Sequence, residues 1–204
     1  LSTDHATHLS DPGCNDSQIC TGCLGGGADA DLLNVANSVP PLIGENFTVS
    51  SVNDLCILEF DFEAGGDSIS FNYVFGSDEY LTYVNTTYND IFAFFLSGPG
   101  ISGPFASPIG FPNGSINIAE VPDSDPPLPV TISSVNNVTN VEYYINNPGN
   151  LGICINGYTE TFTASATVQC GETYHIKLAI ADGSDSALES FVVLEEGSFS
   201  SNAI

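Results

Sequence analysis

The amino-acid sequence predicts an all-β protein, an antiparallel β-sandwich of jelly-roll type with long loops. Many short segments alternate apolar and polar residues with a period of two, and Tyr174–Ala181 does so most clearly. Stretches rich in turn residues, such as Asp125-Pro126-Pro127, separate these segments. A chain of 204 residues with a hydrophobic fraction of 42% can bury a sizeable core in one domain. We therefore predict a single domain over residues 1–204, without internal repeats.

Residues 1–46 form an irregular segment rich in cysteine and glycine, and the sandwich core spans residues 47–204. We expect one short helical turn near Asp31–Asn37. In the core, Cys56–Phe62 and Ile69–Phe75 predict a β-hairpin across a short Gly-rich turn. Ile91–Leu96 is apolar on both faces, which indicates a central strand covered on each side. Further strands are expected at Ile116–Ala119, Val130–Val135, Glu142–Ile145, Thr161–Val168, Tyr174–Ala181 and Phe191–Glu195.

The six cysteines suit an oxidising compartment. The N-terminal segment carries side chains that could bind zinc, with a C-x-x-C spacing among them: His5, His8, Cys14, Cys20 and Cys23. We prefer disulfides, because the C-x-x-C pair is single and an oxidising compartment favours disulfide formation. Cys154 and Cys170 flank a pair of predicted strands and are expected to bridge each other. Cys56 would then join the N-terminal cluster, although other pairings stay open.

The stretch Phe71–Leu96 joins two apolar runs, FNYVF and IFAFFL, through a loop rich in oxygen-bearing side chains. Calcium binds about six to eight oxygens from carboxylates, amides and carbonyls. The predicted metal ligands are Asp78, Glu79, Asn89 and Asp90 in this loop, Asp182 and Asp185 after the strand at 174–181, and Asp29 and Asp31 in the Gly-rich loop. No EF-hand spacing is present, and the alternative is turn chemistry, since Asp and Asn cap turns without an ion.

The charge of the chain is very one-sided. Acidic residues number 25, whereas Lys and Arg together number 1, namely Lys177, and the formal net charge is −24. Such a surface is a poor partner for nucleic acid or an anionic membrane. The charge fits either general acidic solubility or metal binding, and the missing arginines favour calcium where carboxylates cluster.

Neither catalysis nor membrane insertion is indicated. The sequence contains no GxSxG, HExxH or P-loop motif, and His175 lies in the middle of a predicted strand. Neighbouring carboxylates such as Asp78 and Glu79 diverge on a strand, which does not suit glycoside hydrolysis. The chain has no Met and no long apolar run, which we interpret as a processed, mature and soluble product. We expect a protein that is not an enzyme.

Several segments together resemble the choice-of-anchor L domain of secreted bacterial surface proteins, common in Bacteroidota. The segments that carry the resemblance are LST at 1–3, GADADL at 27–32, LEFDFEAGGDSISFNYVFGSDEY at 58–80, NDIFAFFLSGPGI at 89–101, NIAEVP at 117–122, PVTISSVN at 129–136 and the long stretch 157–199. The resemblance implies export and attachment to the cell surface, without enzymatic activity. It covers nearly the whole chain.

In the family that the sequence resembles, the LST motif follows an N-terminal portion, whereas here it opens the chain. One interpretation is simple truncation, in which the given chain is a shortened piece of a longer domain. In the other, a sandwich without that portion exposes a groove or edge that a strand from another subunit could fill. We therefore expect a calcium-stabilised structural or adhesive surface module that self-associates into an extracellular filament. The alternative is a monomeric adhesin that recognises a glycan or another surface protein through its acidic loops.

Overall fold

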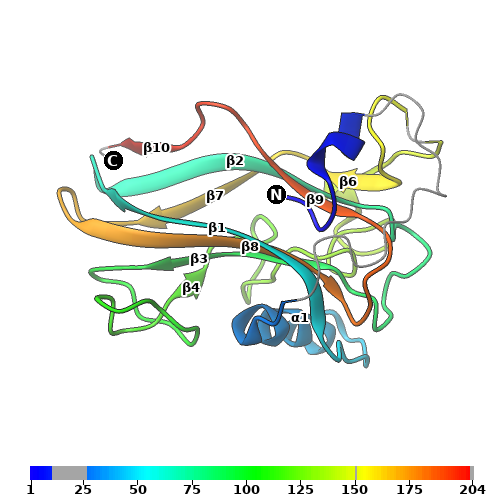
Figure 1. Ribbon diagram of the computed structural model, residues 1–204, viewed down its shortest axis with the longest axis horizontal. Coiled ribbons are helices and arrows are strands. Elements are labelled where there is room, and N and C mark those ends of the chain that lie inside the picture. The colour runs from blue at the N-terminus through cyan, green and yellow to red at the C-terminus, as the bar shows by residue number, and fades with distance from the viewer. Residues whose placement is uncertain (11–26, 150, 203–204) are drawn as a thin grey trace.

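The computed structural model describes residues 1–10, 27–149 and 151–202. Two antiparallel sheets pack face to face (Figure 1), which confirms the predicted all-β sandwich. The lower sheet in Figure 1 has the order β1 (Val52–Glu63), β8 (Thr173–Gly183), β3 (Ile91–Ser97) and β4 (Ile116–Asn117). The upper sheet has the order β10 (Ser200–Asn202), β2 (Ser68–Ser77), β6 (Gly157–Thr159) and β5 (Tyr144–Asn146), and β7 (Phe162–Thr167) and β9 (Ser190–Leu194) also pair with β2.

Aromatic side chains of β2 and β3 form the centre of the core between the sheets. The rings of Phe71 and Phe94 lie 5.1 Å apart, and those of Tyr73 and Phe92 lie 5.4 Å apart. All four side chains are buried. The two apolar runs that flank the acidic loop therefore face each other across the sandwich, one in each sheet.

The predicted hairpin between 56–62 and 69–75 is wrong. β1 pairs with β8 in the lower sheet, whereas β2 pairs with β7 and β9 in the upper sheet. The short turn after Glu63 therefore carries the chain from one sheet to the other. Alternating residues show only that each strand buries one face. Two consecutive strands can bury these faces as neighbours in one sheet, or they can lie in two sheets that pack face to face.

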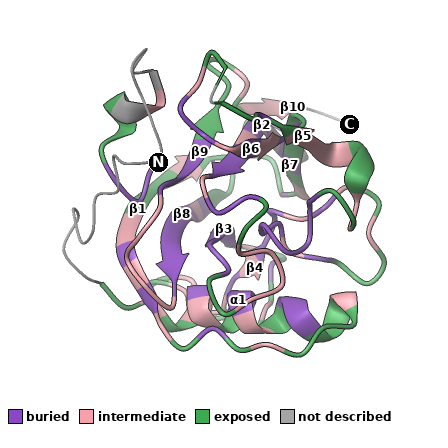
Figure 2. Cartoon of the chain, turned by 90° about the vertical axis from the view of Figure 1, so that its right-hand side faces the viewer, coloured by how far each residue is buried: buried purple, intermediate pink, exposed green. Residues whose placement is uncertain are grey.

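A second core lies on the outer face of the lower sheet, where α1 (Ala30–Ile43) packs against β3 and β8. Leu32, Val35 and Ala36 of the helix are buried against β3, which explains why β3 is apolar on both faces. In Figure 2, β3 and β8 are largely purple, which marks them as buried. The helix is longer than the predicted turn, because Pro40 and Pro41 lie inside its last turn instead of ending it earlier.

Long connections fill the space between β3 and β5. The strand predicted at 130–135 is wrong, because this segment forms a turn with only isolated bridges from Thr131 to Ile91 and from Pro129 to Glu120. Side-chain hydroxyls satisfy its backbone, with Ser134 Oγ accepting from Thr131 N at 2.7 Å. Two short 3-10 helices, η1 (Ala6–Ser10) and η2 (Val141–Tyr143), complete the described elements.

The expected bridge between Cys154 and Cys170 is wrong. Cys170 is a free thiol whose Sγ lies 3.5 Å from Gly65 O, before the start of β2. Cys154 precedes Ile155, which packs at Gly76 near the other end of β2. Ten residues of strand separate these ends by about 30 Å, whereas a disulfide requires Cα atoms within about 7 Å.

Cys56 is also a free thiol, so its expected bond to the N-terminal cysteines is wrong as well. Cys14, Cys20 and Cys23 lie outside the described residues, as does the side chain of His8. The choice between zinc and disulfides at the N-terminal segment therefore stays a prediction.

Candidate metal site

Acidic side chains from three elements meet at one end of the sandwich. Glu79 lies two residues after Ser77, the last residue of β2. Asp90 immediately precedes β3, and Asp182 is the penultimate residue of β8. The antiparallel register pairs Ile91 with Ala181. Asp90, just before Ile91, therefore lies beside Asp182, just after Ala181. The fold thereby joins two acidic groups that are far apart in the sequence.

Three carboxyl groups at this place are almost completely buried. The exposed fractions are 0% for Asp90, 1% for Glu79 and 2% for Asp182. We call these three residues the carboxylate cluster. An ionised carboxylate without a compensating charge is very unfavourable at such burial, because water no longer solvates it.

Asp90 receives the most hydrogen bonds of the three. Its Oδ1 accepts from Gly183 N at 3.0 Å, and its Oδ2 accepts from Ser190 Oγ at 2.5 Å and from Ser77 Oγ at 3.4 Å. Burial raises the pKa of Asp90, and the hydrogen bonds from Ser190 and Gly183 oppose that rise. Asp90 is therefore the member of the cluster that ionises most easily.

Glu79 and Asp182 are less well compensated. Burial, followed by the charges of Asp90, Asp185 and Asp182, raises the pKa of Glu79 to about 12. Burial, followed by the charge of Asp90, also raises the pKa of Asp182. Among the described residues, Glu79 Oε2 and Asp182 Oδ1 have no hydrogen-bond partner. Both oxygens are thus ready to accept a ligand with positive charge.

Two basic side chains of the described residues, Lys177 and His175, are paired with acidic residues outside the cluster. Lys177 is the only Lys or Arg, and its Nζ lies 2.8 Å from Asp29 Oδ2. His175 pairs with Asp61, with Nδ1 and Oδ1 2.7 Å apart, on the outer face of the lower sheet. Lys and Arg therefore cannot neutralise the carboxylate cluster.

The arrangement fits a hard cation by its chemistry, although no three His, Cys, Asp or Glu side chains in the described ranges already surround a metal position. Instead, the side chains of Glu79 and Asp90 share a hydrogen bond. Two carboxyl groups form such a bond only when one of them holds a proton. A cation bound here would replace that proton and draw the oxygens toward itself.

Asn89 and Gly183 shape the wall of this site. Asn89 is fully buried; its Oδ1 accepts from Ser133 N at 3.3 Å, and its Nδ2 has no hydrogen-bond partner within the described residues. A Cβ at Gly183 would lie 2.6 Å from Asn89 O, so any side chain there would push the Asn89 backbone away. The glycine lets the chain before β3 approach the end of β8 closely.

The other predicted metal ligands lie apart from the cluster or at its margin. Asp185 is half-buried, and its charge contributes to the raised pKa of Glu79. Asp78 Oδ1 accepts from Asn156 N at 3.0 Å. Asp29 caps α1 by accepting from Leu32 N at 2.9 Å, and Asp31 accepts from Ala106 N at the same distance.

The sequence analysis missed Asp54 and Ser190, and it did not include Ser77 of the acidic loop among the predicted ligands. Asp54 is 1% exposed, lies at a bulge in β1 with φ of 48°, and its charge contributes to the raised pKa of Asp182. A buried Asp at a left-handed position in a strand has no signal in a pattern of apolar and polar residues. The two serines carry no signal either, because only the fold brings them to Asp90.

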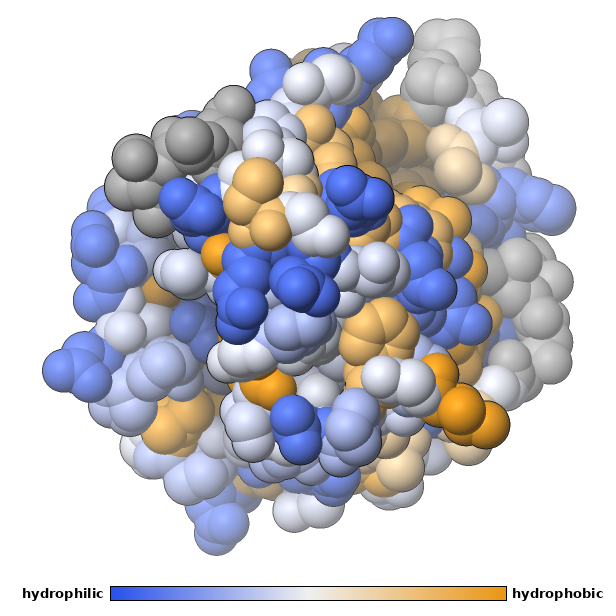
Figure 3. Space-filling view, turned by 90° about the vertical axis from the view of Figure 1, so that its left-hand side faces the viewer, coloured by the Kyte–Doolittle hydropathy of each residue, from blue (hydrophilic) through white to orange (hydrophobic). Residues whose placement is uncertain are grey.

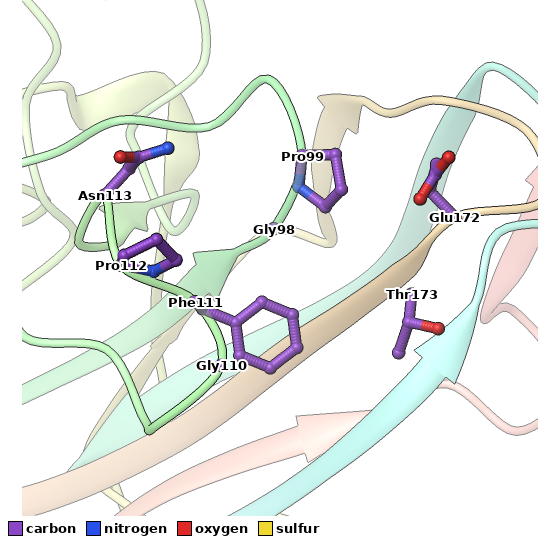
Figure 4. Close-up of a pocket in the computed structure, with 8 residues that line it drawn as sticks. All are labelled: Gly98, Pro99, Gly110, Phe111, Pro112, Asn113, Glu172 and Thr173. Atoms are coloured by element: carbon purple, nitrogen blue, oxygen red, sulfur yellow. The ribbon is translucent and has the colours of Figure 1, made fainter.

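A surface pocket of about 440 Å³ lies elsewhere on the lower sheet (Figure 4). Its lining includes Pro99, Phe111 and Pro112, with polar groups from Asn113 and Glu172. Tyr174 fixes one side, because its hydroxyl donates to Pro99 O at 2.8 Å. A pocket lined by an aromatic ring, two prolines and a few polar groups suits a small polar ligand.

No curated protein and no solved structure matches the chain. None of the described helices is long and apolar enough to cross a membrane. The sequence model of a family described as the Choice-of-anchor L domain matches residues 1–200, which is nearly the full length and agrees with the resemblance found in the sequence. The chain belongs to the Choice-of-anchor L domain family, whose members are cell-surface or secreted proteins.

Proposed function

We propose that this cell-surface module is a structural domain that calcium stabilises at the carboxylate cluster. The observation that carries the proposal is the burial of Glu79, Asp90 and Asp182 beside one another, with an unpartnered oxygen on two of them in the described part of the chain. Like charges about 4 Å apart repel by about 4 kcal/mol near a protein surface. A divalent cation converts this repulsion into attraction.

Calcium fits this site better than other common metals. The cluster offers only carboxylate oxygens, with the Asn89 amide and backbone carbonyls beside it, and such hard oxygen ligands are those that calcium takes. The side chains of the cluster include no Cys or His, which zinc prefers. Extracellular calcium modules bind with dissociation constants of about 10⁻⁴ to 10⁻³ M, which suits a protein exposed to a millimolar medium.

A structural role also fits the position of the cluster. The end of β2, the start of β3 and the end of β8 belong to both sheets, so one ion would tie the two sheets together at this end. We propose no catalytic role.

Thermal unfolding of the wild-type chain in calcium, magnesium and excess chelator tests the proposal. We expect calcium at about 100 times its dissociation constant to add about 2.7 kcal/mol. For a chain of this size this is a rise in Tm of about 5–10 °C. The Asp182→Asn variant should lose most of this rise, whereas Asp61→Asn, on the exposed face of β1, should keep it. Equal melting temperatures of the wild type in calcium and chelator would refute the proposal.

A second candidate function is assembly on the cell surface by strand addition, including the self-assembled filament. The observation that favours it is the outer edge of β1, which no described strand covers. The alternative is an adhesin that binds a glycan in the pocket of Figure 4. Size-exclusion chromatography of the chain alone, with and without calcium, tests the self-assembled filament, because a chain that stays monomeric under both conditions does not polymerise and leaves an adhesin or strand addition to another protein.

A further inference from the structure

The outer edge of β1 is a long backbone surface ready for another strand. β1 has 12 residues, lies at the edge of the lower sheet, and pairs only with β8 in the part of the chain that the structure describes. Edge strands in soluble proteins are usually short or covered, because their free N–H and C=O groups template pairing. In the described ranges, this edge is neither short nor covered by another strand.

The inner face of β1 lines an apolar groove between the two sheets. Leu58 is 46% exposed and Phe60 is 37% exposed, although both point toward the sandwich interior. Phe60, Phe71, Leu194 and Phe199 line a cavity of about 140 Å³ in this groove. Cavities of about 150 Å³ hold a benzene molecule, so this one can accept an apolar side chain. A strand added beside β1 would place every second residue over the groove.

The opposite face of β1 carries a row of carboxylates, at Glu59, Asp61 and Glu63. All three residues are exposed. His175 of β8 lies 2.7 Å from Asp61 and 3.6 Å from Glu59, and Lys177, the cross-strand partner of Glu59 on β8, is paired through its Nζ with Asp29. On the end of the molecule shown in Figure 3, hydrophobic residues lie among strongly hydrophilic ones.

We infer that β1 accepts an extended strand from a different protein, with apolar residues toward the groove and Lys or Arg residues toward the carboxylates. This deepens the second candidate function and rests on it. Cross-strand pairs of opposite charge stabilise a sheet, and like charges directly opposite destabilise it. The backbone edge therefore requires an extended strand, and the carboxylates require basic side chains on one face of that strand.

A second copy of this chain is a poor donor. It has one Lys or Arg and a net charge of −24, so its strands cannot supply a basic row. Two β1 strands paired with each other would bring their carboxylate rows together. The acidic row thus blocks self-association at this edge, and the same row attracts a basic strand.

Binding of a synthetic peptide to the intact chain tests this inference. The probe alternates Val and Lys, and its control has Glu in place of each Lys. We expect binding of the Lys peptide at least about tenfold tighter than that of the Glu peptide, decreasing as salt rises. Equal affinities for the two peptides, or no binding of the Lys peptide, would overturn the inference.

N-methylation of the probe separates strand addition from simple charge attraction. In an added strand, alternate N–H groups face β1 and the others face solvent. Methylation in one frame should therefore abolish binding, and methylation in the other frame should leave it nearly unchanged. Similar affinity in both frames would contradict strand addition.

Two variants of β1 test the groove. Leu58→Glu puts a charge into the groove and should weaken the Lys peptide at least about tenfold. Ile57→Glu alters a residue of similar exposure, 43%, on the opposite face of the same strand, and should keep or strengthen binding. Size-exclusion chromatography of the chain alone tests whether a second copy binds at β1 instead. A homopolymer in the wild type that Leu58→Glu disperses would show that the bound strand comes from a second copy, and it would overturn the inference. The melting temperature in calcium is independent of all these readouts, so failure here leaves the calcium proposal intact.

Discussion

Two sets of carboxylates in this molecule have the same chemistry and opposite surroundings. Glu79, Asp90 and Asp182 are buried at one end of the sandwich, and burial raises the pKa of each. Glu59 and Asp61 lie exposed on β1, beside His175. The comparison shows that net charge alone says little about function, because water compensates the exposed set and only a proton or a cation can compensate the buried set.

Replacing one carboxylate in each set gives the sharpest contrast and the largest expected effect. In calcium, Asp90→Asn should lower the free energy of unfolding by about 2–3 kcal/mol, because the ion loses a ligand. In chelator the same variant should be neutral or stabilising, because it removes a buried charge. Asp61→Asn should change stability by less than about 0.5 kcal/mol in both media. Chemical unfolding of the four samples checks this, and a loss of equal size for Asp90→Asn in both media would contradict it.

The pH dependence of stability in chelator should have an unusual sign. The buried set has a raised pKa, so the folded chain holds more protons than the unfolded chain above about pH 4. Stability therefore falls as pH rises from about 5 to 8, by up to about 1.4 kcal/mol per pH unit for each extra proton held. Calcium should remove most of this loss, so the gap between the two curves widens with pH.

Glu79→Gln provides the control for the pH curve. Because a neutral amide cannot ionise, this variant should make the fall of the chelator curve between pH 5 and 8 shallower, and the remaining slope should come from Asp182 and Asp90. A curve that rises with pH in the wild-type chain would show that the cluster is ionised and compensated without an added cation.

Gly183→Ala should damage the wall of the site without removing any carboxylate. Its Cβ would lie 2.6 Å from Asn89 O and 2.8 Å from Asn89 C, so we expect a loss of about 1–3 kcal/mol and weaker calcium binding. Gly65→Ala is the matched control, because a Cβ there meets its nearest atom at an ordinary 3.7 Å. Calorimetry of both variants checks the difference, and equal stability would show that the close approach at Gly183 is unimportant.

The smallest effect is expected at the predicted ligands outside the cluster. Asp29→Ala should lower stability by about 1–2 kcal/mol, because α1 loses its cap and Lys177 loses its partner. The rise in Tm with calcium should stay the same as in the wild-type chain. A smaller rise in Asp29→Ala would mean that the Gly-rich loop also binds the ion.

The fold class follows from local patterns, and the pairing of strands does not. The alternation in Tyr174–Ala181 predicts a strand with one buried face, and β8 occupies that position. The alternation in β1 and β2 is equally clear, yet it led to the prediction of a hairpin between two strands that lie in different sheets. Which strands pair depends on how the whole core closes, which no single segment contains.

The candidate site divides in a similar way. Glu79, Asn89, Asp90 and Asp182 were predicted from oxygen-rich turns and missing arginines. Their gathering at one point depends on the register of β3 against β8, which the sequence does not reveal. Asp54 was not predicted for the same reason, because its burial and its charge interaction with Asp182 of β8 exist only in the folded sheet.

The most direct test of the central claim is a crystal structure of the chain grown in millimolar calcium, with anomalous diffraction to identify the ion. We predict one calcium ion between Glu79, Asp90 and Asp182, with oxygens at about 2.3–2.6 Å, and the Glu79–Asp90 hydrogen bond replaced by contacts to the ion. An unchanged Glu79–Asp90 hydrogen bond, with no anomalous density between the three carboxylates, would contradict the account.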